Sequence, residues 1–418
     1  MTTETTTETP HEEKKTGFAI FLEELSRNNI TVIVLAILTG IILGGVLVAA
    51  TTDEVYAAFK LSAWEGIKTS LSTAWNTYVA LFTGAFGSPE KIRAAFESGD
   101  PLTIRRAINP FFESLVQATP YIFAGLAVAL GFRAGLFNIG VEGQIFMGAV
   151  ASVWAGYAIH GLPAIIHIPL ALLIGALGGA IWGFIPGLLK ARTGAHEVIT
   201  TIMMNYIAFR LTDWLLKFPM KDPNEYTPKT PVIEESAKLI KFFQDPIRFH
   251  IGFLVAIFVA VLIYILLFKT TWGMELRMVG SNPSAARYAG IKITLSTVMA
   301  MVLSGALAGL AGANEVLGLN HRLVPSFSSG YGFDSIALAL LGKSHPLGVV
   351  LSALLFGFLR NGARAMQLTV GVPIDIVSIL QALILAFIAA PAIIRTIYRL
   401  KEPKYTEDLV SLRSWSGE

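Results

Sequence analysis

Long apolar runs recur along the chain, and each is bounded by charged residues or by clusters of Pro, Gly and Asn. A helix of roughly 20 apolar residues crosses a hydrocarbon core about 30 Å thick, and most of the runs are close to that length. The pattern predicts an all-α, polytopic membrane protein with about ten transmembrane helices. The predicted helices cover residues 30–50, 115–132, 136–159, 163–189, 198–216, 251–268, 293–317, 333–341, 346–359 and 373–394.

The segments outside these runs are polar or mixed. Residues 1–29 begin with a Thr- and Glu-rich stretch that is typical of a disordered tail. Residues 51–114 are weakly amphipathic, and we expect them to lie on the extracytoplasmic side with a helix at the membrane surface. The aromatic residues that suit such a helix are Tyr56, Phe59, Trp64, Trp75 and Tyr78. Residues 115–394 form the predicted core, and residues 395–418 form a second tail.

The distribution of Lys and Arg predicts the orientation. Basic residues precede the first run and gather in residues 190–192, 269–292 and 395–404. Loops rich in Lys and Arg remain in the cytoplasm, so both termini are predicted to be cytoplasmic. The loop over residues 217–250 is the exception, but its basic residues are accompanied by acidic ones.

The composition agrees with this class and excludes others. Of 418 residues, 54% are hydrophobic and only 15% are charged, against roughly 25% in soluble domains. A net charge of +3 argues against a nucleic-acid-binding protein, which needs a clustered basic face. The chain has no Cys and seven His, and we recognise no metal site in it. Residues 337–344 match a loose phosphate-loop pattern without its Gly-rich backbone, so no ATP site is predicted.

Two segments interrupt the apolar pattern. Residues 131–144 contain four Gly residues together with Arg133, Asn138, Glu142 and Gln144. Residues 330–346 contain a second such interruption. Transporters often have discontinuous helices at corresponding positions of their two halves. Irregular backbone at membrane depth persists only where it is buried in protein or lines a water-filled path, so both segments are predicted to be functional.

Glu142 and Asp334 are the ionisable residues of these segments that stand out. A carboxylate exposed to lipid would cost a few kcal/mol even on the mildest scale. Each carboxylate therefore either lines a translocation path or caps the N-terminus of a half-helix, where backbone N–H groups favour negative charge. The sequence leaves both interpretations open, and they are compatible.

Two further patterns concern helix faces. Glu197, Thr201 and Asn205 recur every four residues and share one face, which either lines the path or holds helices together by hydrogen bonds. Asn205 is the pathway candidate among them. Gly175, Gly179, Gly183 and Gly187 form a smooth ridge in another run, which predicts close helix packing.

Residues 272–291 have the pattern of a short helix, a turn and a second short helix. Ser281 or Asn282 can cap the helix that Pro283 starts, since Pro fits the first helical turn, and Gly290 ends it. An ordered structure between two transmembrane helices indicates a partner surface, although a plain connecting loop is the alternative.

Four motifs in order carry a resemblance. Residues 273–290 are similar to the coupling-helix region of bacterial ABC importer permeases of the ribose, branched-chain amino acid and nucleoside group. Together with residues 135–144, 197–205 and 339–348 they resemble the nucleoside and simple-sugar permeases within that group. The resemblance extends from about residue 115 to residue 394.

The resemblance implies a permease in the bacterial cytoplasmic membrane, with ten helices in two related halves and a cobalamin-importer-like architecture. It implies a separate cytoplasmic ABC ATPase that binds ATP, so no cofactor is expected in this chain. It also implies an extracytoplasmic substrate-binding lipoprotein and a second, related permease chain. The expected substrate is a nucleoside, with a simple sugar as the alternative.

By position, the resemblance also assigns residues to two roles. The residues implied to dock onto the ATPase are Glu275, Arg277, Asn282, Ala285, Ala286 and Gly290. The residues implied to line or shape the path are Phe137, Asn138, Glu142, Gln144, Asn205 and Asp334.

Two other classes of protein are alternatives to an ABC permease, namely an ion-coupled secondary transporter and a membrane-embedded enzyme. The carboxylates of Glu142 and Asp334 would suit an ion-coupled secondary transporter, but such a carrier has no evident need for a structured loop at residues 272–291. A membrane-embedded enzyme would need a nucleophile or metal set facing a cavity, and the sequence shows no such pattern.

Overall fold

The computed structural model describes residues 29–373 and 375–400. Among these residues the regular secondary structure is helical, apart from one isolated β-bridge between Lys241 and His250. The predicted tails over residues 1–29 and 395–418 lie almost entirely outside the described residues. The all-α class is confirmed.

The helices follow the predicted runs closely. Their bounds are α2 Asn29–Thr51, α3 Asp53–Leu61, α4 Ala63–Phe86, α5 Pro89–Ser98, α6 Pro101–Arg133, α7 Val141–Ala158, α8 Ala164–Thr193, α9 Glu197–Lys217, α10 Gly252–Lys269, α11 Thr271–Ser281, α12 Pro283–Tyr288, α13 Ile293–Glu315, α14 Tyr331–Leu341, α15 Pro346–Val370, α16 Asp375–Ala389 and α17 Pro391–Ile397. A single 3₁₀ turn, η1, covers Glu235–Ala237, and a π-helix, η2, covers Val316–Asn320.

Six of the described helices are long and apolar enough to cross a membrane, namely α2, α6, α8, α10, α13 and α15. The bent pair α16 and α17 makes a seventh if it is counted as one span. At 11 residues, α14 is about 16 Å long, so it reaches only part of the way through a bilayer. The run predicted at residues 333–341 is thus a half-helix. The count of ten crossings stays a prediction.

Helix α6 is longer than the pattern indicated, because it begins at Pro101 within the segment expected to lie outside. Asp100 starts it by accepting hydrogen bonds from the backbone N–H groups of Leu102 and Thr103, and Pro101 occupies the first turn. Farther along α6, every residue from Val116 to Gly131 is buried. This helix is the centre of the core.

Close packing between α8 and α13 depends on the predicted glycine ridge. A Cβ on Gly179 would lie 2.2 Å from the carbonyl oxygen of Gly305, and a Cβ on Gly309 would lie 2.3 Å from that of Gly175. Any side chain at these positions would separate the two helices. The packing role predicted for the ridge is confirmed.

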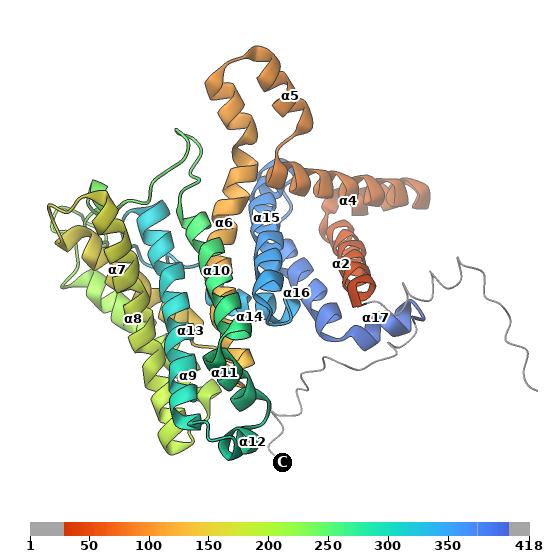
Figure 1. The fold of residues 1–418 in the computed structure, drawn as a ribbon. Coiled ribbons are helices and arrows are strands. Elements are labelled where there is room, and N and C mark those ends of the chain that lie inside the picture. Colours follow the sequence, from red (N-terminus) through yellow and green to blue (C-terminus); the bar gives the residue numbers. More distant parts are fainter. Residues whose placement is uncertain (1–28, 374, 401–418) are drawn as a thin grey trace, which may run out of the picture.

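The N-terminal helices form a separate layer beside α15 and α16. Helix α4 lies crosswise to α15 (Figure 1), and Ser62 caps it by accepting a hydrogen bond from Glu65 N–H at 3.1 Å. Its outward face exposes Trp64, Leu71, Trp75 and Phe82. An amphipathic helix is therefore present where one was predicted, and its place at a membrane surface stays a prediction.

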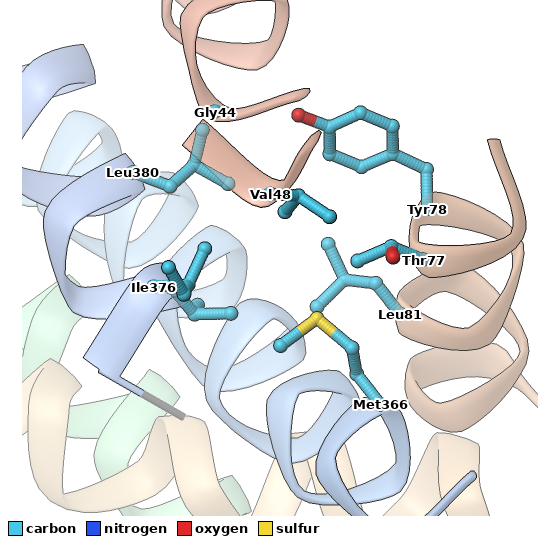
Figure 2. A pocket seen from close by; sticks show the side chains of 9 residues that line it. Gly44, Val48, Thr77, Tyr78, Leu81, Met366, Ile376 and Leu380 are labelled. Atoms are coloured by element: carbon cyan, nitrogen blue, oxygen red, sulfur yellow. The ribbon is translucent and has the colours of Figure 1, made fainter. Parts of the chain in front are cut away.

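A small apolar cavity lies between α2, α4, α15 and α16. Figure 2 shows Val48, Tyr78, Met366 and Ile376 around it. Its volume of about 10 Å³ holds at most one water molecule. This cavity is a packing defect and is too small to be a substrate site.

The two ends of the molecule are distinct. Helix α5 lies at one end, and α11 and α12 lie at the opposite end (Figure 1). The long loop over residues 217–250 shares the α5 end, since Arg105 of α6 donates a hydrogen bond to Gln244 at 2.7 Å. This arrangement agrees with the predicted assignment of these segments to opposite sides of the membrane.

Candidate functional site

The two broken segments meet each other through Glu142. This residue is in the first turn of α7 and is only 3% exposed. Its carboxylate accepts hydrogen bonds from the hydroxyl of Ser328 and from the backbone N–H of Gly332, both at 2.5 Å. Glu142 therefore caps the N-terminus of the half-helix α14, which is one of the two roles that the sequence left open.

Glycine at position 332 allows this contact. A Cβ there would lie 2.3 Å from the backbone nitrogen of Glu142 and 2.8 Å from its carboxylate. The preceding Gly330 has φ +86°, a conformation that side chains other than Gly rarely adopt. The chain can thus turn from the loop into α14 directly against the start of α7.

Asp334 is bound differently, within a polar group contributed by α6, α14 and α15. It accepts a hydrogen bond from the Tyr121 hydroxyl at 2.7 Å and forms an ion pair with Arg360 at 3.2 Å. The guanidinium of Arg360 also lies 5.2 Å from the ring centre of Tyr331 and donates to the carbonyl oxygen of Ser329 at 2.9 Å. This carboxylate is paired rather than capping a helix.

Sequence reasoning missed Arg360, because the predicted helix ended at residue 359. The structure continues α15 to Val370, which places Arg360 inside the bundle with 21% of its side chain exposed. The signal that could have found it is the apolar stretch that resumes after Asn361. Tyr121 and Tyr331 were also missed, since nothing in a sequence pattern distinguishes them from core aromatics.

Asn205 caps α7, the helix that follows the first broken segment. Its Oδ1 accepts from the backbone N–H of Gly143 at 2.8 Å, and its Nδ2 donates to the carbonyl oxygen of Ile139 at 3.0 Å. The residue is 1% exposed. Both ends of the amide are thus committed to the start of α7, so Asn205 shapes the broken segment.

Asn138 and Gln144 form a buried network beside Asn205. The Nδ2 of Asn138 donates to Oε1 of Gln144 at 3.0 Å and to the hydroxyl of Ser304 at 2.9 Å, and its Oδ1 accepts from Gly140 N–H at 2.9 Å. Ser304 in turn donates to the carbonyl oxygen of Ala127 at 2.7 Å. The network ties the broken segment to α6 and α13.

Phe137 lies at the edge of this network and is partly exposed. Its ring stacks on Phe132 with the ring centres 5.3 Å apart. The six predicted pathway residues therefore form two neighbouring groups. Glu142 and Asp334 lie around the start of α14, and Phe137, Asn138, Gln144 and Asn205 lie around the start of α7.

The stripe on α9 favours helix association. Glu197 pairs with Lys190 of α8 at 2.8 Å, and Thr201 is buried with its hydroxyl bonded to the Glu197 carbonyl at 2.7 Å. A Cβ on Gly140 would lie 3.0 Å from Thr201. Of the two interpretations for this face, hydrogen-bonded packing is the one these contacts support.

Residues 271–290 form two short helices with a turn, as predicted. Asn282 provides the cap, since its Oδ1 accepts from Ala285 N–H at 3.0 Å, and Gly290 ends the second helix with φ +82°. Every residue from Ser281 to Gly290 is exposed except Ala286. We call residues 281–290 the coupling surface.

The predicted docking residues differ in their surroundings. Asn282, Ala285 and Gly290 are exposed, whereas Ala286 is fully buried and supports the coupling surface from behind. Glu275 is half-buried, and the Arg277 guanidinium lies 5.1 Å from the ring centre of Phe268 in α10. Tyr288, which sequence reasoning did not single out, is 95% exposed on the same surface.

The turn between α14 and α15 is anchored near the coupling surface. Arg133, at the end of α6, donates to the carbonyl oxygens of Ser344 at 2.9 Å and Lys343 at 3.1 Å. Those residues form the turn between α14 and α15 and have φ of 51° each. Two hydrogen bonds therefore tie the end of α6 to the turn that follows α14.

Two other kinds of site can be assessed among the described residues, a metal site and a groove. They contain no group of three His, Asp or Glu side chains placed to hold a metal ion. A groove of about 400 Å³ on the outside of α7, α8 and α9 is lined by Trp154, Tyr157 and aliphatic residues, and no charged residue contributes to it. The concentration of charged and hydrogen-bonded groups around α7 and α14 is the stronger candidate.

Comparison with known proteins identifies the family to which this chain belongs. A family model described as the branched-chain amino acid transport system / permease component matches residues 111–391. The chain belongs to this family. The match begins and ends close to the predicted core of residues 115–394.

Individual relatives agree. A guanosine ABC transporter permease protein of Bacillus subtilis is 48% identical over 288 residues, which are 68% of this chain and 82% of the relative. A glucose ABC transporter permease protein of Haloferax volcanii is 38% identical over 288 residues, or 66% and 75% of the two chains. A nucleoside ABC transporter permease protein of Lactococcus lactis is 38% identical over 290 residues, or 68% and 79%.

Family membership confirms the resemblance and the polytopic all-α class. The chain is a membrane-spanning ABC permease, and such a permease works with an ATPase and a substrate-binding protein. The exposed coupling surface and the capped helices α7 and α14 therefore belong to a transporter permease.

Proposed function

We propose that the chain is the permease subunit of an ATP-driven importer for nucleosides. The observation that carries this proposal is the 48% identity to a guanosine ABC transporter permease protein over 68% of the chain. The Lactococcus relative, a nucleoside ABC transporter permease protein, supports the same substrate class. ATP is hydrolysed on a separate subunit.

The proposed complex has four kinds of component. A cytoplasmic ABC ATPase docks on the coupling surface, with Asn282, Ala285, Gly290 and Tyr288 presented to it. Glu275 and Arg277 transmit its movement to α10, and Ala286 holds α12 against the membrane helices. A second, related permease chain completes the path, and a lipoprotein delivers substrate on the opposite side. Both termini are cytoplasmic.

Transport needs no covalent step in this chain. Closure of the ATPase displaces α12 and α11. Helix α11 contacts the end of α6, and Arg133 passes the displacement to the turn before α15. Helix α7 and the half-helix α14 are joined by the Glu142 cap, so they reorient together and open the path alternately to each side.

The pathway residues divide into lining and shaping roles. Phe137 and Asp334 are partly exposed and line the path, and an aromatic face such as that of Phe137 suits a nucleobase. The other four residues make their hydrogen bonds within the protein and hold α7 and α14 in place. They are Glu142, Asn138, Gln144 and Asn205.

A simple sugar is the alternative substrate. The glucose permease relative from Haloferax volcanii has the same 38% identity as the nucleoside permease from Lactococcus. An ion-coupled carrier is the weaker alternative, because it would leave the exposed and ordered coupling surface without a role.

The test is an uptake assay in the native bacterium. Deletion of the gene should lower uptake of radiolabelled nucleosides, leave glucose uptake unchanged, and be reversed by the full chain supplied in trans. Gentle detergent extraction of the tagged chain should bring an ABC ATPase with it, identified by mass spectrometry. Loss of glucose uptake alone would replace the nucleoside proposal by the sugar one. Uptake on an ion gradient by the purified chain alone would overturn both.

A further inference from the structure

One buried carboxylate has no function in the arrangement described so far. Glu315 is the last residue of α13 and is followed directly by the π-helix η2. It is 4% exposed, and its Oε1 is buried without a hydrogen-bond partner among the described residues. A π-helix inside or beside an α-helix frequently marks a functional site.

Glu315 differs in this respect from the other two carboxylates of the region. Glu142 accepts two hydrogen bonds from the protein, and Asp334 is bonded to Tyr121 and Arg360. Burying a carboxylate oxygen without a partner is costly. An ionisable group in a membrane-spanning helix that has no internal partner is therefore a candidate for binding a ligand.

The side chain faces the candidate site. Glu315 shares one face of α13 with Ser304, Ala308 and Ala311, because seven and eleven residues are close to two and three helical turns. Ser304 on that face bonds to the backbone of α6 and to Asn138 of the broken segment. Glu315 thus lies about three helical turns along α13 from Ser304 of the Asn138 network, toward the end of α13 that is predicted to be extracytoplasmic.

Charged and aromatic groups of α14 and α15 lie within electrostatic range of it. These groups are Tyr331 and the guanidinium groups of Arg360 and Arg364, and Arg248 of the loop before α10 and Glu113 of α6 also act on Glu315. On α6, Gln117 is also buried, and its Oε1 has no hydrogen-bond partner among the described residues. Both α6 and α13 thus carry a buried acceptor without a donor among the described residues.

We propose that Glu315 binds the base of the transported nucleoside and selects guanine, an inference that rests on the proposed nucleoside function. A carboxylate has two parallel acceptor oxygens. Guanine presents two parallel donors on one edge, the N1–H and the 2-amino group, so a bidentate pair can form. Hypoxanthine has only the N1–H donor. Adenine and cytosine place a ring-nitrogen acceptor beside their amino group, which a carboxylate repels.

The test compares base selectivity rather than total activity. The full chain and its Glu315→Gln and Glu315→Asp variants are expressed in the deletion strain with the native partner subunits. Initial uptake of tritiated guanosine, inosine and cytidine is measured over a range of concentrations, and membrane abundance is determined by immunoblot. Glu197→Gln is the matched control, since the Glu197 side chain is a carboxylate with only 12% exposure that is already paired with Lys190.

In Glu315→Gln one acceptor oxygen becomes an N–H donor that faces the guanine 2-amino group. We expect the ratio of guanosine to inosine uptake to fall about tenfold or more, through a raised KM for guanosine. Inosine uptake should stay within about twofold, because its single N1–H still meets the remaining oxygen. Glu315→Asp should retain the preference at lower affinity, and Glu197→Gln should leave the ratio unchanged.

Other outcomes overturn the inference. A wild-type chain that transports nucleosides without preferring guanosine, or a Glu315→Gln variant that loses all nucleosides equally at normal abundance, would show that Glu315 does not select the base. If Glu315→Gln fails to reach the membrane, Glu315→Asp decides by the same ratio. Absence of nucleoside uptake by the wild-type chain itself would instead overturn the proposed function, and this inference with it.

Discussion

Gly280, at the end of α11, lies directly against the backbone of Arg133 at the end of α6. A Cβ on Gly280 would lie 2.3 Å from the Arg133 carbonyl oxygen, and a Cβ on Gly135 would lie 2.8 Å from the Gly280 Cα. No side chain separates the coupling helix from the turn that opens the broken segment. Since packed backbones deform little, displacement of α11 must move that turn.

This contact predicts a large effect of a small substitution. Gly280→Ala should lower nucleoside uptake about tenfold or more at normal membrane abundance, because the added methyl group forces α11 away from α6 at a cost of about 1–3 kcal/mol. Uptake in the complemented deletion strain, together with an immunoblot of the membranes, measures both quantities.

Gly161→Ala is the control for that substitution. Gly161 has φ +77°, and a Cβ there would meet no atom within 4 Å, so only the local backbone strain of about 1–2 kcal/mol applies. Uptake by this variant should stay within about twofold of wild type. Equal losses in the two variants would mean that the Gly280 contact has no special part in coupling.

Much of the fold follows from patterns that the sequence carries locally. Apolar runs bounded by polar clusters give the helices because the bilayer demands an apolar surface of a set length. The glycine ridge of α8 and the caps at Asn282 and Gly290 follow from side-chain size and turn geometry. The two interruptions of the apolar pattern also mark the broken segments correctly.

The pairing of residues between elements could not be predicted in this way. That Glu142 caps α14 rather than its own helix depends on how α7 and α14 meet. Arg360 was placed outside a helix because a charge normally ends an apolar run, whereas here Asp334 and Tyr121 compensate it. Glu315 lies inside the helix predicted over residues 293–317 without any pattern around it, so only its burial makes it conspicuous.

The coupling surface gives a second prediction. Tyr288→Ala should remove most of the ATPase that co-purifies with the tagged chain, since exposed aromatic side chains are often interface anchors. The chain itself should insert normally, because Tyr288 is 95% exposed and contributes little to the core. The measurement is the ratio of ATPase to permease in the extract by quantitative mass spectrometry.

Tyr226→Ala is the matched control, because Tyr226 is 99% exposed but lies in the loop at the opposite end of the molecule. Its ATPase ratio should equal that of wild type. A Tyr288→Ala variant that retains its full complement of ATPase would show that this side chain is not part of the docking surface.

The ion pair between Asp334 and Arg360 gives a third prediction. Arg360→Met leaves a partly buried carboxylate without its cation and should lower stability in detergent by about 1–3 kcal/mol, less than for a fully buried pair. The double variant with Asp334→Asn removes both charges and should recover at least half of that loss. Thermal unfolding of the four proteins in a double-mutant cycle measures the coupling.

The size of that coupling decides between two roles for Asp334. A coupling energy of about 1 kcal/mol or more assigns the pair to holding α14 against α15. Additive effects would contradict the structural role of the pair, and the carboxylate would then be free to serve the path alone.

A fourth prediction concerns pH and His250, which lies just before α10. Burial, together with the positive charges of His321, Arg248 and Lys241, lowers the pKa of His250 to about 4. Its Nδ1 accepts a hydrogen bond from Gly252 N–H at 3.1 Å, so the folded protein requires the neutral ring. Because the folded pKa lies below the unfolded value of about 6.5, protonation favours the unfolded chain. This contribution to stability is complete above about pH 6.5 and is lost as the pH falls to about 4.

The effect should amount to about 2–3 kcal/mol by pH 4, and it should appear as a fall in the unfolding temperature between pH 6.5 and 4. His250→Asn keeps an acceptor near Gly252 but does not titrate, so its unfolding temperature should fall less over the same range. His160→Asn is the control, since the His160 side chain is 70% exposed, and it should follow the wild-type curve. If His250→Asn also follows the wild-type curve, then acid must destabilise the protein through other groups, and the buried ring of His250 would not be the cause.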